Sequence, residues 1–336
     1  MRKTGKAFAI LMIIAFLLSI LTLQPLPTKA QDISSITIEA DGSIKPSAAP
    51  IRQEGDTYTL MGDFEGSINI QKSNIIFNGN NNTLFGGIIV LSDYTTIANT
   101  TIMYANSPIE AFGQTTAIML FSSHNNITGN YLSNNTIGIN FASEIIYAIE
   151  HPASECKKNY VVGNTITNCY TALKFYSSQD NHIYHNNFIN NNYTVGDSGF
   201  IYYYPSKPSI NVWDDGYGSG NFWDDYLTRY PNATESNTPS VGDTPYLIRP
   251  AAYIDPAGLS TQESKEYWTN MNALYAQNVD HYPLMVPFGS ENKTSGLPSD
   301  IESFLFAIIG ITVAILAVAF TLLFFRRHQT TAKSKQ

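Results

Sequence analysis

The sequence predicts an all-β protein, a parallel β-solenoid of about six turns, and three observations lead to this prediction. The first is an internal repeat of six positions, with an aliphatic residue at position 1, Asn or Thr at position 4, an apolar residue at position 6 and any residue at the other positions. The second is the shortness of the apolar segments, which cannot bury a core alone but can stack on identical neighbours. The third is composition, because 31 Asn and 22 Gly, without a 3.6-residue apolar period, disfavour helices.

The repeat sets the predicted turn length. Its frames begin at a degenerate copy at Ile75 and then at Ile97, Ile127, Val161 and Ile183, so they lie 22, 30, 34 and 22 residues apart. Two intervals equal 22 residues, and the other two exceed that value by 8 and 12. A second apolar segment accompanies most copies, with Ser- and Asn-rich turns between the segments. We therefore predict turns of about 22 residues, two of which carry insertions.

The Asn or Thr of each frame predicts a hydrogen-bonded ladder. In a stacked coil, a side-chain amide can bond the same residue one turn away, which satisfies polar groups buried at a bend. The predicted ladder residues are Asn78, Thr100, Asn130, Asn164 and Asn186.

The two insertions are candidate binding loops. They lie at about 103–116 and 142–159, and in solenoids such insertions often line the binding surface, although ornamental loops are the alternative. Eliminating or hydrolysing enzymes need paired ionisable groups, and the second insertion offers Glu144, Glu150 and His151 as catalytic candidates, with a solvated loop as the alternative. The carboxylates of the repeats share no register, and the net charge of -8 would repel an acidic polysaccharide.

Both ends of the chain predict export. Basic residues at 2–6 precede an apolar run at 7–23 and a small-residue site ending at Ala30, which is typical of a cleaved signal peptide, with an uncleaved anchor as the alternative. Residues 304–325 carry no charge and would span about 33 Å as a helix, enough to cross a bilayer. The basic tail that follows predicts a cytoplasmic C-terminus.

These features give a domain plan for a single-pass membrane protein whose β-domain is extracellular or periplasmic. The predicted parts are a signal peptide (1–30), an N-terminal lead-in (31–56), the β-helix repeats (57–200), a C-terminal cap (201–290), a linker (291–303), a transmembrane helix (304–325) and a cytoplasmic tail (326–336).

Composition excludes several classes of protein. A net charge of -8 and the lack of Arg between Arg52 and Arg229 leave no surface for reading phosphates, so we expect no nucleic-acid partner. Two cysteines cannot make a disulfide scaffold or a four-thiolate zinc site. Cys156 and Cys169 either pair outside the cell or remain two free, buried thiols.

A family resemblance rests on longer motifs. These are Ser73–Gly79, the rungs of Asn-Ile-Thr-Gly-Asn type, Asn181–Asn191, the doubled Trp-Asp-Asp segment Asn211–Tyr226, Gly242–Tyr246 and Asp280–Met285. Over about residues 57 to 288 the chain resembles the NosD-like right-handed parallel β-helix proteins, with a departure at residues 251–277. The resemblance implies a right-handed β-helix of a surface or periplasmic protein, of archaeal type. It also implies copper handling as one role, while related β-helix modules bind or cleave carbohydrates.

Aromatic residues are the candidate ligand contacts. In the C-terminal region Trp213 and Trp223 either cap the open end of the coil, as a solenoid requires, or stack on sugars. With residues of the two insertions, the predicted ligand-binding set is Tyr104, Phe112, Tyr147, Trp213 and Trp223.

Two metals are considered. Calcium is the candidate for the aspartates of the doubled motif, although their spacing does not match a known calcium loop and turn positions are the alternative. Copper follows only from the resemblance, with His182 and His185 as candidate ligands, and residues three apart on a strand face opposite sides unless a bend intervenes. The four aspartates are Asp214, Asp215, Asp224 and Asp225.

The sequence therefore predicts an envelope-anchored β-helix protein that binds glycans or other envelope components, with the membrane as a partner through its C-terminal helix. A polysaccharide-modifying enzyme on the same scaffold is the first alternative, and a copper-handling accessory protein is the second.

Overall fold

The computed structural model describes residues 33–104, 115–142, 156–176, 178–197, 209–249 and 261–290. The chain divides into two units, Met1–Val286 and Pro287–Gln336, and only residues 287–290 of the second are described. No helix within the described ranges is both long and apolar enough to span a membrane. The predicted signal peptide and the predicted transmembrane segment lie outside these ranges, so both stay predictions.

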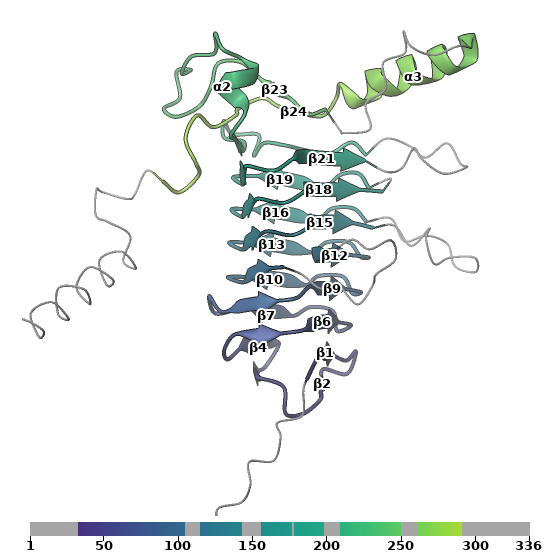
Figure 1. Cartoon of the computed structure of the whole chain (residues 1–336), viewed down its shortest axis with the longest axis vertical. Helices are drawn as coiled ribbons and strands as arrows, with labels where there is room; N and C mark the ends of the chain where they lie inside the picture. The colour runs from purple at the N-terminus through teal and green to yellow at the C-terminus, as the bar shows by residue number, and fades with distance from the viewer. Residues whose placement is uncertain are drawn as a thin grey trace, which may run out of the picture. The chain divides into compact units, whose positions relative to one another are not determined.

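The described part of the first unit is a parallel β-helix with three sheets, in which successive strands of the chain pass from one sheet to the next (Figure 1). The longest, sheet 1, has eight strands and contains the second apolar segment of each repeat. In spatial order its strands are β2 (Ile44–Lys45), β1 (Ser35–Ile38), β6 (Ser67–Ile70), β9 (Ile88–Val90), β12 (Thr116–Leu120), β15 (Ile137–Phe141), β18 (Thr171–Phe175) and β21 (Tyr193–Asp197).

Sheet 2 contains the first apolar residue of each repeat frame. Six of its seven strands run parallel, in agreement with the predicted number of turns, and β3 pairs antiparallel with β4 at the N-terminal edge. In spatial order they are β19 (His182–Tyr184), β16 (Tyr160–Val162), β13 (Asn126–Thr128), β10 (Thr96–Ala98), β7 (Ile76–Asn78), β4 (Thr57–Leu60) and β3 (Ile51–Glu54).

Sheet 3 contains the last apolar residue of each frame and extends into the C-terminal cap. Its seven strands all pair in parallel. In spatial order they are β22 (Phe222–Trp223), β20 (Asn187–Ile189), β17 (Thr165–Thr167), β14 (Tyr131–Ser133), β11 (Thr101–Met103), β8 (Thr83–Phe85) and β5 (Phe64–Glu65).

The repeat frames align strand on strand. In sheet 2, Ile97 pairs with Ile127, Ile127 with Val161, and Val161 with Ile183, and all four side chains are fully buried. Their inward side chains form the core, because period-2 alternation turns every second residue of a strand toward the interior. The degenerate first frame is out of register by two residues, since Phe77 is the residue that pairs with Ile97.

Residues with a left-handed backbone conformation form the bends between the sheets. His124 (φ 60°) and Gly129 (φ 63°) mark the two bends that flank β13, and each directly precedes a buried Asn. The positive φ favours Gly, Asn, Asp or His at such positions. The same pattern recurs in successive turns, which explains why Asn is so abundant in this chain.

The N-terminal edge begins earlier than the sequence predicts. β1, which lies in the predicted lead-in, is already a parallel neighbour of β6. The antiparallel strand β2 covers the outer edge of β1, and β3 does the same for β4. These short strands protect the open end of the solenoid, where unpaired strand edges would invite aggregation.

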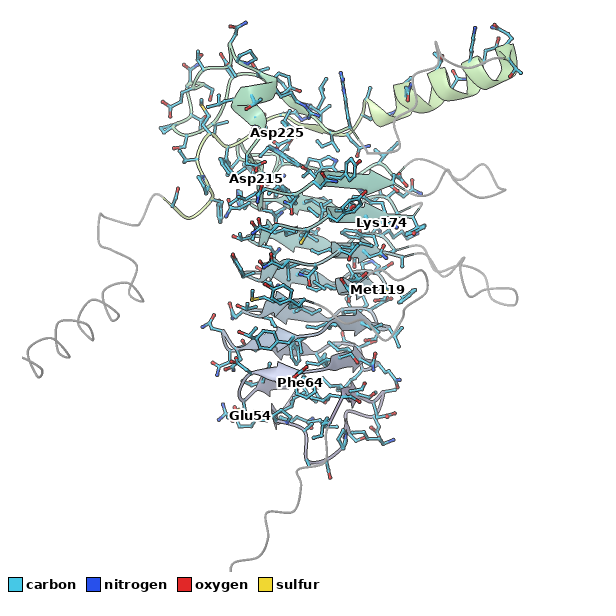
Figure 2. All side chains as sticks on the ribbon, viewed as in Figure 1. Glu54, Phe64, Met119, Lys174, Asp215 and Asp225 are labelled. Atoms are coloured by element: carbon cyan, nitrogen blue, oxygen red, sulfur yellow. The ribbon has the colours of Figure 1, made fainter. Side chains whose placement is uncertain are left out.

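The C-terminal cap contains α2 (Tyr226–Arg229), α3 (Gln262–Tyr275) and the antiparallel pair β23 (Tyr246–Leu247) and β24 (Val279–Asp280). Figure 2 shows Asp215 and Asp225 at the cap end of the stack, and Glu54 and Phe64 at the N-terminal end. Aromatic stacking continues from the core into the cap, because Phe188 stacks on Trp223 at 4.7 Å and Trp223 stacks on Tyr246 at 4.3 Å between ring centroids.

Candidate binding pocket beside the C-terminal cap

The predicted ladder is present from Thr100 onward. The backbone N–H of Thr100 donates to Oδ1 of Asn130 at 3.0 Å. The N–H and the Nδ2 of Asn130 both donate to Oδ1 of Asn164, at 2.9 and 3.0 Å. Asn164 repeats this pair of bonds to Asn186, and Asn186 repeats it to Asn221, all at 3.0 to 3.1 Å. Each amide therefore satisfies a buried backbone donor of the preceding turn.

Asn78 is not part of this ladder, and the prediction for it is wrong. Because the first frame is out of register, Asn82 lies in the position equivalent to Thr100. Oδ1 of Asn78 instead accepts the N–H of Asn80 at 2.8 Å and Nδ2 of Asn99 at 3.4 Å, on the outer side of the bend.

A second ladder runs along the other bend, and the sequence analysis missed it. Asn125 donates its N–H and Nδ2 to Oδ1 of Asn159, at 2.9 and 3.0 Å. Asn159 donates in the same way to Asn181, and Asn181 to Asn211. The signal was an Asn five residues before a ladder Asn in three successive frames, at 125, 159 and 181.

Both ladders end on one short segment of the cap. Asn278 Oδ1 accepts the N–H of Asn211 at 2.9 Å, and Asp280 Oδ2 accepts the N–H of Asn221 at 2.8 Å. The segment around β24 thus supplies the last rung of each ladder. Because the two residues alternate with Val279 along one strand, their side chains leave the same face.

Trp213 and Trp223 are buried residues of the cap. Both indole side chains are 1% exposed, so neither ring offers a face to a sugar. Trp213 Nε1 donates to Asn278 Oδ1 at 2.8 Å, and Trp223 Nε1 donates to Asp280 Oδ2 at 2.8 Å. The cap alternative therefore describes both residues, and stacking of either ring on a sugar is not supported.

Burial raises the pKa of Asp280 to about 7. The N–H groups of Asn221, Trp223 and Tyr282, which donate to its two carboxylate oxygens at 2.8 to 3.0 Å, oppose this rise because they stabilise the charged form. Asp280 is therefore a buried acid whose charge changes near neutral pH.

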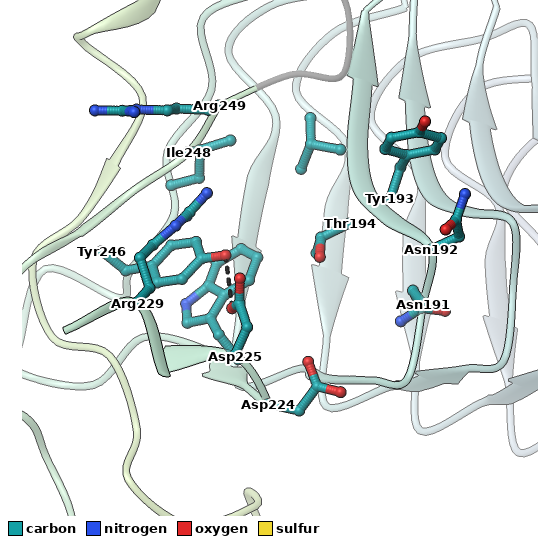
Figure 3. A pocket seen from close by; sticks show the side chains of 12 residues that line it. Asn191, Asn192, Tyr193, Thr194, Asp224, Asp225, Arg229, Tyr246, Ile248 and Arg249 are labelled. Atoms are coloured by element: carbon teal, nitrogen blue, oxygen red, sulfur yellow. Dashed lines mark hydrogen bonds between the residues drawn. The ribbon is translucent and has the colours of Figure 1, made fainter. Parts of the chain in front are cut away.

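A pocket of about 190 Å³ lies where the last turn meets the cap (Figure 3). One wall is formed by β21 and the turn before it, and the other by residues of β22 and β23 and of the segments that follow these strands. The lining combines amides, hydroxyls, aromatic rings and both signs of charge. It consists of Asn191, Asn192, Tyr193, Thr194, Val195, Trp223, Asp224, Asp225, Arg229, Tyr246, Ile248 and Arg249.

The side chains of the cap wall are held by contacts with one another. The guanidinium of Arg229 lies over the ring of Tyr246, 4.7 Å from its centroid, and Nη1 donates to the carbonyl of Leu247 at 3.1 Å. The Tyr246 hydroxyl donates to Asp225 Oδ1 at 2.9 Å (Figure 3). Burial, followed by the adjacent Asp225 charge, raises the pKa of Tyr246, so this hydroxyl remains a donor at neutral pH.

Several polar groups of the pocket are uncommitted. Within the part of the chain that the structure describes, the side chains of Asn192, Thr194 and Arg249 have no hydrogen-bond or ion-pair partner. Asp224 uses Oδ2 to accept the N–H of Asn190 and leaves Oδ1 without a donor among the same residues. These groups can bind a polar ligand without breaking a protein contact.

The four aspartates of the doubled motif make different contacts and do not form one site. Asp214 accepts the N–H of Gly216 at 3.0 Å and lies 2.9 Å from Nδ1 of His281. Asp215 accepts the N–H groups of Tyr217 and Ser219, as expected at a turn. Asp224 and Asp225 instead line the pocket. Among the described residues, no group of three or more His, Cys, Asp or Glu side chains could hold a metal ion.

The two histidines proposed for copper are engaged elsewhere. The ring of His182 stacks on Tyr160 at 4.7 Å on the outside of sheet 2. His185 lies at the bend with φ 58°, and its Nε2 is 3.4 Å from Oδ2 of Asp215. Burial lowers the pKa of His185, against the opposing effect of Asp215. The donor set around these histidines therefore does not fit a copper site within the described ranges.

The other predicted residues are placed as follows. Tyr104 is 58% exposed at a bend and has a positive φ. Cys156 and Cys169 are buried free thiols, which is the second of the two states left open by the sequence. Phe112, Tyr147, Glu144, Glu150 and His151 lie outside the described residues, so the proposals for the insertions stay untested.

The pocket does not follow from the repeat, because its lining comes from three segments that share no repeat. One signal was available: between Arg52 and Arg326 the sequence has only Arg229 and Arg249, and both line this pocket.

Comparison with protein families gives a match to the family described as periplasmic copper-binding protein (NosD), over residues 147–228. The matched segment covers the last turns of the β-helix and the start of the cap, including β22. Comparison with curated proteins and with solved structures gave no match. The periplasmic description of the family agrees with the export predicted from the N-terminus. Together with the three parallel sheets, the match confirms that this chain is a β-helix protein similar to the NosD family.

Proposed function

We propose that this chain is an outward-facing, membrane-anchored β-helix binding protein whose ligand is a glycan, held in the pocket between the last turn and the cap. The observation that carries the proposal is the set of uncommitted polar groups in that pocket, namely Asn192, Thr194, Arg249 and one oxygen of Asp224. Sugar hydroxyls both donate and accept hydrogen bonds, so they need such a mixture of amide, hydroxyl, carboxylate and guanidinium groups.

An aromatic side chain at the pocket adds a stacking surface. Tyr193 is 41% exposed, and its ring lies edge-on to Tyr170 with centroids 5.4 Å apart. A ring fixed by a neighbour costs little entropy when a sugar packs its C–H face against it. The volume of about 190 Å³ is below that of sites for drug-sized ligands and suits a single sugar ring.

Copper handling is the second candidate, and it is favoured only by the description of the matched family. Among the described residues, no group of three or more His, Cys, Asp or Glu side chains could hold a metal ion, and we derive no step through copper.

The test is thermal unfolding of the full chain, purified in a mild detergent, with a panel of envelope glycans and separately with Cu(I), Cu(II) and Ca²⁺. A ligand that binds only the native state raises the unfolding temperature. We expect a rise with at least one glycan, and we expect Tyr193→Ala to abolish it. Tyr131→Ala is the matched control, because Tyr131 is 43% exposed on sheet 3 and does not line the pocket.

Copper alone raising the unfolding temperature, with every glycan inert, would overturn glycan binding in favour of metal handling. Loss of the glycan effect in both tyrosine variants would remove the pocket from the proposal.

A further inference from the structure

The arginines of this chain are concentrated at one place. Outside the N-terminal 30 residues and the C-terminal tail the sequence has three arginines, Arg52, Arg229 and Arg249. Arg52 lies on β3 at the opposite end of the solenoid and pairs with Glu54 at 3.1 Å. The other two line the same pocket. In a chain with a net charge of -8, this placement gives the pocket the only guanidinium pair among the described residues.

Neither guanidinium of the pocket forms an ion pair with a described residue. Asp224 and Asp225 also line the pocket, yet no carboxylate oxygen of the described residues lies within 4 Å of Arg229 or Arg249. The Asp225 oxygen Oδ1 is taken by the Tyr246 hydroxyl, and Asp224 accepts from the backbone of Asn190. Two guanidinium groups thus face the cavity beside two carboxylates, each of which uses one oxygen to accept a hydrogen bond from another donor.

The side chains of the two arginines differ in how many protein contacts hold them. Arg229 is oriented by its stacking on Tyr246 and by its bond to the carbonyl of Leu247. These contacts use one N–H and leave the others of the guanidinium available. Arg249 is exposed, and its five N–H donors have no partner in the described part of the chain. A planar guanidinium of this kind matches a carboxylate through two parallel hydrogen bonds.

We propose that the pocket binds an acidic sugar, with the carboxylate of a uronate residue on Arg249 and assisted by Arg229, and with the sugar hydroxyls on Asn192 and Asp224. This inference rests on the proposed glycan-binding function and names its ligand class. The net charge of -8 does not oppose it, because repulsion from distant charges is screened beyond about 8 Å at physiological salt, whereas a bidentate contact acts at hydrogen-bond distance.

The test is isothermal titration calorimetry on the full chain in detergent, with uronate trisaccharides (galacturonate, glucuronate-containing and mannuronate). The matched ligands are the same trisaccharides with every carboxylate methyl-esterified, which keep the sugar hydroxyls and remove the charge. Sodium sulfate serves as the sugar-free oxyanion. We expect at least one uronate to bind about tenfold or more tightly than its ester, as the loss of a charge-assisted hydrogen bond implies.

The variants separate the role of the pocket from general charge. Arg249→Gln should weaken uronate binding by about tenfold or more and weaken binding of the ester by a smaller factor, because the ester lacks the charge-assisted contact. Arg52→Gln removes the same charge at the other end of the solenoid and should leave uronate binding unchanged. Because Arg249 has no partner in the described residues, its substitution should not lower the unfolding temperature.

Each contrary result has a distinct meaning. Equal binding of a uronate and its ester would overturn the acidic ligand and leave glycan binding intact. Tight binding of neutral glycans from the thermal panel, with all uronates inert, would do the same. No binding of any sugar would overturn the proposed function as well. Sulfate binding as tightly as every uronate would assign the pocket to a free oxyanion, against an acidic sugar.

Discussion

The buried carboxylate of Asp280 accepts the indole N–H of Trp223 at 2.8 Å, and it is also the last rung of an Asn ladder. Two residues earlier, Asn278 makes the equivalent bond to Trp213 and ends the second ladder. The two ends differ in one respect, because one rung is an acid and the other is an amide. This difference makes the stability of the cap depend on pH.

The free energy of unfolding should fall as the pH rises from about 4 to about 7. Below the unfolded pKa of 3.8, Asp280 is protonated in both states. Between 3.8 and about 7 the unfolded carboxyl ionises while the folded one stays protonated, so protonation favours the fold and this contribution is lost as the pH rises. Each unit of difference between the folded and unfolded pKa is worth about 1.4 kcal/mol, so the free energy of unfolding should fall by at most about 4 kcal/mol over this range.

The measurement is urea unfolding of the full chain at several pH values, compared with Asp280→Asn. The amide can accept the bonds from Asn221 and Trp223 but does not titrate, so the variant should lack this decrease. Asn278→Asp is the matched reverse variant and should add a second decrease. Parallel pH profiles for the wild type and Asp280→Asn would contradict the prediction.

The ladder should contribute strongly to stability at its middle rungs. Asn164→Ala leaves the backbone N–H of Asn130 and one of its two Nδ2 hydrogens without an acceptor in the core, while the other Nδ2 hydrogen keeps the carbonyl of Ile97, so we expect a loss of roughly 2–4 kcal/mol in the free energy of unfolding. Asn126→Ala, at an exposed position of β13, should change the free energy of unfolding by less than about 0.5 kcal/mol. Denaturant titration of both variants checks the difference, and equal losses would argue against the ladder.

The sequence predicted the central turns well because stacking imposes a repeated constraint. The inward residues Ile97, Ile127, Val161 and Ile183 occupy equivalent positions, so one frame describes all of them. The second ladder obeys the same constraint, and its Asn residues recur five positions earlier, so it was predictable in principle. The register error at Ile75 arose because Asn78 lies at the expected spacing from Ile75, whereas the true ladder position of this turn, Asn82, lies five residues after Phe77 instead of three.

The contacts that close the C-terminal end of the solenoid could not be predicted from the repeat. Asn278 meets Asn211 from 67 residues away, and Asp280 meets Asn221 from 59 residues away, across a segment with no repeat. No local pattern links such partners. The pocket has the same origin, because Tyr193, Arg229 and Tyr246 are brought together only when the cap closes on the last turn.

The two cysteines should be unreactive in the native protein. Burial raises the pKa of Cys156 to about 12 and also raises the pKa of Cys169, so almost no thiolate is present at neutral pH. An alkylating reagent should label neither thiol until denaturant is added, and then both. Mass spectrometry without a reducing agent counts the labelled sites, and a denatured protein that takes up no label would indicate a disulfide.

The two tryptophan bonds should differ in their response to pH. Trp223→Phe and Trp213→Phe both keep an aromatic ring and remove one N–H donor. The donor lost in Trp223→Phe stabilises the ionised form of Asp280, so its removal should raise the pKa of Asp280 further. A bond to a charged acceptor is worth about 1.5–3 kcal/mol, against about 0.5–1.5 kcal/mol for a neutral one. The loss of stability in Trp223→Phe should therefore be larger at pH 8 than at pH 5. Trp213→Phe removes a bond to the uncharged Asn278, so the stability that this variant loses should be the same at pH 5 and pH 8. Unfolding curves for the two variants at each pH would show whether the charge on Asp280 causes the difference.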